Sequence, residues 1–226
     1  MGRARVTPKD VAGALLEAAV NLAEEGGVGA IGLREAARRA GVTHGAPYRH
    51  YPNHQALIAA VAEDGFRRLL AAAVLALSAA GPDPLQRFSA LGRGYLHFAR
   101  QHPGHFRVMF AAGEGRRTEA VKNAEAAVFA LAVNEIAACQ RVGLARPGDP
   151  QSLALVAWSG VHGLAHLWLD GLVDWIGLGE ASPEDFVARY AAEIFRGLGP
   201  AASPPRPRRR ASGPPKKRVE ARKRRR

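Results

Sequence analysis

The fold of the amino-terminal region is decided by residues 33–52, which read LREAARRAGVTHGAPYRHYP. The apolar residues of the first eight positions recur every three or four residues, so they share one face and predict a helix over 33–40. Gly41 ends this helix, and a hydroxyl residue two positions later predicts a second short helix over 43–51. Two short helices joined by so tight a turn have the dimensions of a helix-turn-helix, whose second helix enters the major groove of DNA.

The second helix of this pair carries groups that suit nucleic acid. Thr43 and the free backbone N–H groups at a helix start can hold a phosphate. Gly45 and Ala46 are small enough to let the backbone approach the groove, and Pro47 falls in the first turn, where a missing N–H costs least. Further hydrogen-bond donors follow in Tyr48, Arg49 and His50.

Other interpretations of these side chains are open at this point. Tyr48 and Tyr51, three residues apart on a helix, can both be core aromatic residues. Arg38 and Arg39 can form a solvated face, and His50 can be a buried, hydrogen-bonded histidine. We favour the core for Tyr51, the solvated face for the two arginines, and DNA for Tyr48 and His50.

The rest of the chain shows helical periodicity interrupted by Gly, Pro and charged loops, and no segment alternates as a strand does. We therefore predict an all-α fold, in which an N-terminal helix-turn-helix three-helix unit is followed by a larger helical bundle. The expected domains are 1–65 and 66–199, followed by a basic tail over 200–226. The other expected helices are 8–25, 53–80, 84–101, 103–110, 118–142, 151–172 and 183–198.

Three segments carry a resemblance to a known family: 33–37 (LREAA), 40–43 (AGVT) and 48–52 (YRHYP), the last followed by Leu57. Over roughly residues 8–60 the chain resembles the DNA-binding domain of the tetracycline-repressor-like (TetR) transcriptional regulators. The resemblance implies that residues 44–46 meet base edges and that Thr43, Tyr48 and His50 hold the DNA backbone.

The chain also departs from the family pattern. Gly32 stands where a Ser or Thr cap is usual, and Ala36 replaces a larger aliphatic residue. His54 stands where a phosphate-contacting Lys is common, and a neutral imidazole is a weaker partner for phosphate than an ammonium. The DNA-binding residues expected from the resemblance and the residue types are Arg34, Thr43, His44, Gly45, Ala46, Tyr48, Arg49, His50 and His54.

Residues 158–163, which read WSGVHG, resemble the signature of the carboxy-terminal WHG domain found in one TetR subgroup. The resemblance implies a ligand-binding, dimer-forming domain whose helices 151–172 and 183–198 pair with their twofold mates. An uncharged helix with small residues such as Gly160 and Gly163 also permits close approach of a partner helix. Because an aromatic-rich bundle can enclose a cavity, its aromatic residues are candidates for a pocket, although each can instead be plain core. The candidate ligand residues are Tyr95, Phe98, Phe106, Met109, Phe110, Phe129, Trp158, His162 and His166.

The alternative hypothesis is an all-helical metal-binding protein or enzyme. His162, His166 and Asp170 are four residues apart on one helical stripe, and two such histidines can share a metal ion. The Glu of an HExxH motif is absent, so the general base of a metalloprotease is missing. We favour a buried, hydrogen-bonded histidine pair, and we expect no metal, no cofactor and no enzymatic activity. Cys139, the single cysteine, is expected to be an inert packed thiol.

The net charge of +12 is concentrated at the end of the chain. Residues 200–226 hold twelve Lys or Arg, one Glu and six Pro, so they carry +11 and have little apolar surface to bury. We expect a disordered tail that adds sequence-independent affinity for DNA by neutralising phosphates. Attraction to an anionic membrane surface and compositional drift are the rival explanations.

These observations together predict a cytoplasmic homodimer that binds double-stranded operator DNA and represses transcription until a small apolar or aromatic molecule releases it. The start of the chain shows no secretory signal. The uncharged run over 150–169 approaches the length of a membrane span, but its serines, glycines and histidines favour a buried helix of a soluble protein.

Overall fold

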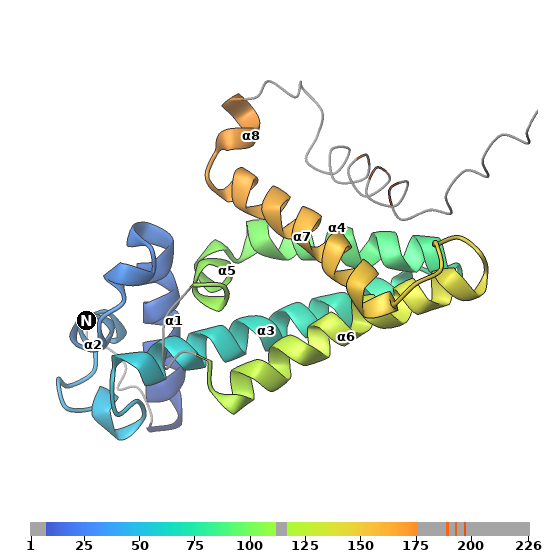
Figure 1. Cartoon of the computed structure of the whole chain (residues 1–226). Coiled ribbons are helices and arrows are strands. Elements are labelled where there is room, and N and C mark those ends of the chain that lie inside the picture. Colours follow the sequence, from blue (N-terminus) through green and yellow to red (C-terminus); the bar gives the residue numbers. More distant parts are fainter. Residues whose placement is uncertain (1–7, 112–116, 176–188, 190–192, 194–196, 198–226) are drawn as a thin grey trace, which may run out of the picture.

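The structure is a computed structural model that describes residues 8–111 and 117–175, together with residues 189, 193 and 197. All regular elements in these residues are helical, in agreement with the predicted all-α class. Helices α1 and α2 lie at one end, while α4, α6, α7 and most of α3 form a longer bundle (Figure 1). The elements are α1 (Pro8–Gly26), η1 (Val28–Ala30), α2 (Leu33–Ala40), η2 (Pro47–Arg49), α3 (His54–Ala79), α4 (Pro84–Gln101), α5 (Pro103–Met109), α6 (Glu119–Arg141), α7 (Pro150–Leu169) and α8 (Leu172–Trp175).

Side-chain caps explain where several of these helices begin. A carboxylate, amide or hydroxyl oxygen accepts a hydrogen bond from the backbone N–H of a residue two or three positions on, which satisfies a donor that the helix leaves free. Most predicted helices therefore match the observed ones to within three residues. The predicted helix 183–198 and the tail 200–226 lie outside the described residues, apart from residues 189, 193 and 197. The capping residues are Asn53 for α3, Asp83 for α4, Thr118 for α6 and Asp149 for α7.

The predicted α-helix over 43–51 is wrong, because the structure has a turn followed by the short 3-10 helix η2. Proline has no N–H, so Pro47 cannot donate to the carbonyl of Thr43, and the α-helical ladder is interrupted where it would begin. Most of the bonds that form span three residues, and one, from the N–H of Tyr51 to the carbonyl of Pro47 at 2.8 Å, spans four. The N–H of Ala46 donates to Thr43 and the N–H of His50 donates to Pro47, each at 3.0 Å.

One continuous core joins the amino-terminal unit to the bundle. Leu15 of α1, Leu57 of α3 and Phe106 of α5 are completely buried in it, and the same core extends to Leu164 of α7. Full burial of one such side chain stabilises the folded state by about 1.5–3 kcal/mol. Because α3 packs against α1, α4, α5 and α6, it physically links the two ends of the molecule.

Helix α7 is less buried than the sequence predicts. By length and composition alone it could cross a membrane. Only 28% of its most apolar stretch is buried inside the protein. Leu153 and Leu164 face the core, whereas Leu155, Val156 and Leu167 are exposed. The prediction of a buried helix therefore holds for one side of α7 only, and the other side is an apolar surface.

Candidate nucleic-acid interface and ligand cavity

The turn after α2 depends on Gly41, whose φ of 69° lies in the left-handed region that glycine adopts without strain. The N–H groups of Gly41 and Val42 donate to the carbonyls of Arg38 and Ala37 at 3.3 and 3.1 Å, which closes the helix. The chain therefore turns at once into residues 43–50, which we call the reading segment.

The reading segment exposes most of the side chains that the sequence predicts for DNA. Tyr48 has 48% of its surface exposed, and Ala46 is half-buried. Pro47 is buried, and η2 contacts α1 and α2. Arg34 is exposed on α2, beside the segment in sequence. The exposed residues of the segment are Thr43, His44, Gly45, Tyr48, Arg49 and His50.

Two hydrogen bonds hold the chain immediately after the reading segment. Tyr51 Oη donates to the carbonyl of Ala12 in α1 at 3.1 Å, and His54 Nε2 donates to the carbonyl of Ile31 at 2.8 Å. Tyr51 is half-buried, so it has the packing role that the sequence favours. Because Nε2–H of His54 is used here, a neutral His54 has only an acceptor left, and it can donate to a phosphate only when protonated.

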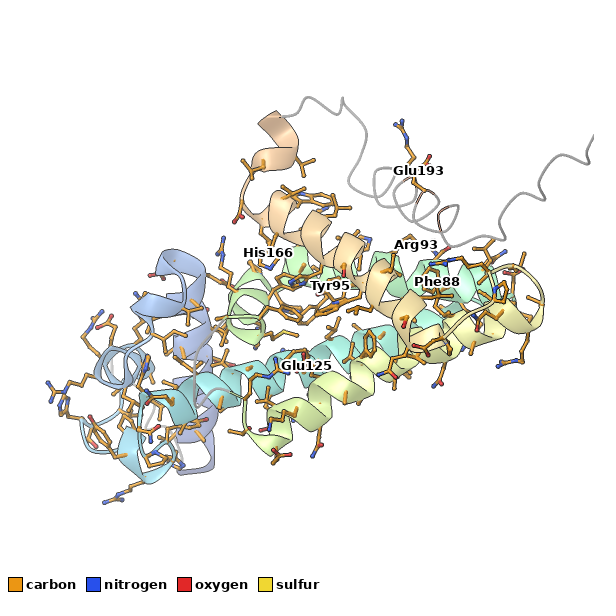
Figure 2. All side chains as sticks on the ribbon, in the orientation of Figure 1. Phe88, Arg93, Tyr95, Glu125, His166 and Glu193 are labelled. Atoms are coloured by element: carbon orange, nitrogen blue, oxygen red, sulfur yellow. The ribbon has the colours of Figure 1, made fainter. Side chains whose placement is uncertain are left out.

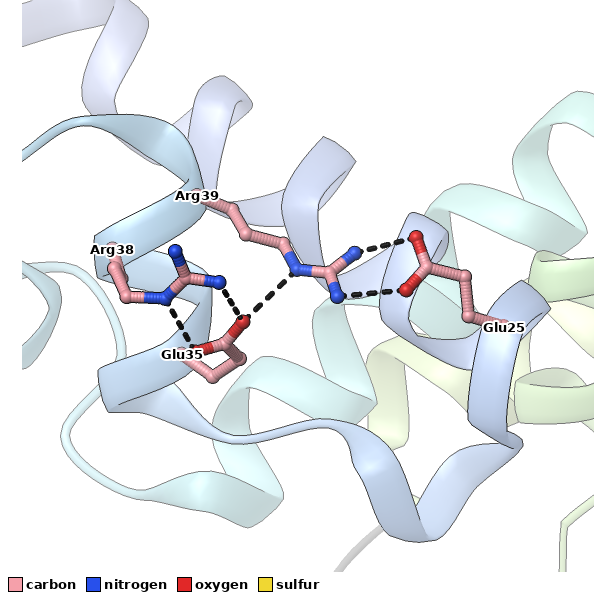
Figure 3. A network of polar contacts seen from close by, with 4 residues as sticks. All are labelled: Glu25, Glu35, Arg38 and Arg39. Atoms are coloured by element: carbon pink, nitrogen blue, oxygen red, sulfur yellow. Dashed lines mark hydrogen bonds and ion pairs between the residues drawn. The ribbon is translucent and has the colours of Figure 1, made fainter.

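Four charged side chains join α1 to α2 (Figure 3). Arg39 donates to both oxygens of Glu25 at 2.6 and 2.7 Å, and also to Glu35 at 3.1 Å. Arg38 donates to both oxygens of Glu35 at 2.8 and 2.6 Å. Hydrogen bonds from Arg38 and Arg39 lower the pKa of Glu35 to about 2. The two arginines therefore form the solvated, ion-paired face that the sequence favours. Exposed pairs of this kind stabilise weakly, so their main effect is to orient α2.

A cavity of about 410 Å³ lies among α3, α4, α6 and α7. Its wall is almost entirely aliphatic and aromatic, which suits a small apolar molecule. Four of the nine predicted ligand residues line it: Tyr95, Phe110, Phe129 and Trp158. The sequence did not predict the lining residues Phe66 and Phe88, nor the charged residues Arg117, Lys122 and Glu125.

The other five predicted ligand residues do not line the cavity. Phe98, Phe106 and Met109 belong to the main core and are at most 6% exposed. The rings of His162 and His166 lie 4.6 Å apart, and each packs against Phe106, at 5.6 and 5.4 Å. These residues support the cavity rather than line it.

A hydrogen-bond network lies at the apolar wall, where the side chain of Tyr95 extends from α4 toward α7 (Figure 2). Tyr95 Oη lies 2.8 Å from His162 Nδ1, and it accepts a hydrogen bond from Trp158 Nε1 at 3.3 Å. Burial, with a smaller contribution from His166, lowers the pKa of His162 to about 4, so the imidazole is neutral at pH 7. Burial also raises the pKa of Tyr95, which stays a neutral phenol.

The residues proposed for metal binding do not converge on one point. Within the described residues, no group of three His, Cys, Asp or Glu side chains is placed to hold a metal ion. His162 Nδ1 is bonded to Tyr95, and Asp170 is exposed at the end of α7. Cys139 is completely buried, which confirms the packed thiol, and burial raises its pKa to about 11.

A buried charged cluster that was not predicted from the sequence lies between α3 and α5. Asp64 accepts hydrogen bonds from His105 Nε2 at 3.0 Å and from Arg68 Nε at 2.6 Å, and Arg67 is a third partner. Burial opposes ionisation of Asp64, but these three bonds together bring its pKa below the ordinary value. The signal in the sequence was an acidic residue at a core-facing position of an apolar helix, one turn after Val61.

The same short helix α5 also touches α1. A Cβ on Gly104 would come within 2.6 Å of the carbonyl of Val20 and of the side chain of Glu24, so only glycine fits. The N–H of Gly104 donates to Glu24 at 3.4 Å, and Arg107 donates to the Glu24 carbonyl at 3.3 Å. Helix α5 therefore connects the amino-terminal unit with the helices around the cavity.

Helices α1 and α2 followed by an exposed reading segment, joined by α3 to a helical bundle with a cavity, are the arrangement of a helix-turn-helix protein with a second helical domain. Two family profiles match the chain. Residues 15–61 match bacterial regulatory proteins of the tetR family, and residues 88–194 match the tetracyclin repressor-like C-terminal domain. The chain belongs to the TetR family of transcriptional regulators.

Solved structures have the same fold. A protein of unknown function from Rhodococcus sp. RHA1 is 35% identical, with a TM-score of 0.71 over 84% of this chain and 95% of that chain. A tetR-family regulatory protein from Rhodococcus RHA1 is 21% identical, with a TM-score of 0.64 over 84% and 97%. RolR in complex with resorcinol is 19% identical, with a TM-score of 0.58 over 85% and 89%. No curated protein sequence matches this chain.

Proposed function

We propose that this regulator is a cytoplasmic homodimer that represses transcription and leaves its operator when a small apolar or aromatic molecule enters the cavity. The proposal rests mainly on the position of α3, which extends from the reading segment to the cavity. This helix begins directly after the reading segment and then lines the cavity with Phe66, Leu69 and Ala73. The resorcinol bound by RolR is a small aromatic compound, which supports a ligand of this kind.

The proposed DNA contacts are those expected from the sequence. The two reading segments of a dimer would enter successive major grooves, about 34–36 Å apart, on a pseudo-palindromic operator. A ligand that favours another spacing would shift the population away from DNA, with a coupling free energy of about 1–3 kcal/mol. Residues 1–65 are the proposed DNA-binding domain, and 66–199 are the proposed ligand-binding and dimerisation domain. The contacts are Arg34, Thr43, His44, Gly45, Ala46, Tyr48, Arg49, His50 and His54.

The test is operator protection with variants of the reading segment. His50→Ala and Tyr48→Ala should each weaken operator binding by about tenfold or more, because each removes a donor to a charged phosphate. Both side chains are exposed, so the variants should fold, dimerise and bind ligand as before. His97→Ala on α4 is the matched control and should leave operator affinity unchanged.

The operator itself is sought in the DNA flanking the gene, by footprinting with the purified protein. Transcription from that operator should rise when the gene is deleted if the protein is a repressor. Unchanged DNA affinity in both variants of the reading segment would refute the assigned contacts, and a fall in transcription on deletion would make the protein an activator.

A further inference from the structure

We propose that the cavity takes an uncharged molecule with an apolar ring as its body and a single hydroxyl group, and that Tyr95 recognises this hydroxyl. The inference rests on the proposed function in that it concerns the effector cavity. It goes further by naming the chemical class of the ligand and the residue that selects it.

The charged side chains of the lining are already neutralised by protein partners. Arg117 is paired with Glu125, and Lys122 Nζ lies 2.7 Å from Glu119. Each of the charged lining residues that the structure describes therefore has an opposite charge beside it. A ligand with its own charge would have to break one of these pairs or leave its charge in an apolar wall, and both cost free energy.

Tyr95 retains capacity for one further hydrogen bond. Its oxygen accepts from Trp158 Nε1 and is bonded to Nδ1 of the neutral His162. If Tyr95 donates to His162, one lone pair of its oxygen is left to accept. If His162 Nδ1–H donates instead, both lone pairs are filled and the Tyr95 O–H is left to donate.

A hydroxyl is the smallest neutral group that fits both arrangements, since it donates and accepts. A carboxylate can only accept and an ammonium can only donate, and neither finds a counter-charge at Tyr95. The network therefore favours one neutral hydroxyl at this wall and disfavours either charged group.

The rest of the wall favours a ring. Phe110 and Phe129 pack against Trp158 with ring centroids at 6.1 and 6.3 Å, in tilted and edge-on geometry. Planar aromatic surfaces of this kind match a flat apolar body. Gly92 also lines the cavity, and a Cβ at this position would meet none of the described residues within 4 Å, so the free space borders α4 directly.

The experiment compares three probes of the same ring size by calorimetry on the full chain at pH 7: 2-naphthol, naphthalene and 2-naphthoate. We expect 2-naphthol to bind about tenfold more tightly than naphthalene, because only the hydroxyl uses the free capacity of Tyr95. We expect 2-naphthoate to bind at least about tenfold more weakly than 2-naphthol, because its charge is desolvated.

Three variants test the residues. Tyr95→Phe should bring the affinity for 2-naphthol down to that for naphthalene while naphthalene itself stays within about threefold, which also shows that the variant folds. Tyr51→Phe, which removes a hydroxyl in the amino-terminal unit, should leave both affinities unchanged. Gly92→Leu should fill the cavity and abolish binding of all three probes.

The outcomes separate this inference from the proposed function. Equal affinity for naphthalene and 2-naphthol, or the tightest binding for 2-naphthoate, overturns the hydroxyl class but leaves an effector cavity. Absence of 2-naphthol binding also overturns it. Operator protection is measured without any ligand, so its failure would refute the DNA-binding proposal and leave the calorimetric result standing.

Discussion

His162 shows how one buried residue makes the stability of this protein depend on pH. Burial lowers its pKa to about 4 from an ordinary value of 6.5, and burial also lowers the pKa of His105 against the opposing hydrogen bond to Asp64. The unfolded chain therefore binds these protons at a higher pH than the folded chain does. The stability contributed by a neutral buried histidine is complete above pH 6.5 and is lost as the pH falls toward the folded value.

We expect the melting temperature to fall steadily between pH 6.5 and pH 4, and to fall less in His162→Asn, which keeps a polar group beside Tyr95 without a titratable ring. Circular dichroism at a series of pH values measures this directly. His44→Asn in the exposed reading segment is the control and should follow the native protein. Identical pH profiles for the native chain and His162→Asn would contradict the role given to His162.

At the residue scale the sequence predicted the apolar and aromatic character of the cavity wall better than it predicted which residues line the cavity. Apolar periodicity shows which helix face is buried, but a void depends on how closely the helices pack. Trp158 and Phe106 therefore look alike in the sequence, although one lines the cavity and the other is core. Arg117 and Glu125 were missed because charged residues at a helix start are normally assigned to solvent.

At the scale of elements, helix boundaries were predictable and the reading segment was not. The caps Asn53 and Asp149 act within one turn, so local sequence suffices to place the starts of α3 and α7. The reading segment begins with Thr43, whose hydroxyl can cap a helix. It also has a proline at position 47, which the first turn of a helix tolerates. The absent N–H of that proline outweighs the capping signal at Thr43, and the segment forms a turn followed by the short 3-10 helix η2.

The turn at Gly41 gives a prediction at this scale. Gly41→Ala should destabilise the protein by about 1–2 kcal/mol, because alanine in the left-handed region brings Cβ close to the carbonyl oxygen. Gly13→Ala, in the interior of α1 where a Cβ would meet no described residue within 4 Å, should instead stabilise by about 0.4–1 kcal/mol. Urea denaturation of both variants checks the signs, and equal effects would refute the strained turn.

At the scale of the whole molecule, the exposed apolar side of α7 is the surface that a second protomer would cover. Gly163 lies on this exposed side, and a Cβ there would meet nothing within 4 Å among the residues that the structure describes. Small residues on such a face permit close helix approach, which is the arrangement expected for the proposed dimer.

Gly163→Arg should therefore give a folded monomer, because position 163 is exposed in the single protomer while a long charged side chain there would block a partner helix. Sedimentation analysis measures the mass, and Asn134→Arg on the exposed side of α6 is the control that should remain a dimer. A dimeric Gly163→Arg protein would place the interface elsewhere.

The charge distribution gives a second prediction at this scale. Deleting residues 200–226 removes +11 of the net +12 charge. If the tail neutralises phosphates, the slope of log K against log salt should become shallower by about 0.9 for each phosphate that the tail neutralises, with the base preference unchanged. An unchanged slope would remove the tail from the DNA interface.

The burial of Cys139 has a practical consequence for measuring the proposed transition. It is the single thiol of the chain, and its burial and raised pKa protect it from maleimide reagents. His44→Cys would then place the one readily labelled thiol of each protomer in the reading segment, with no other substitution. Spin labels at these two positions of a homodimer would act as a molecular ruler that reads the separation of the two segments with and without effector.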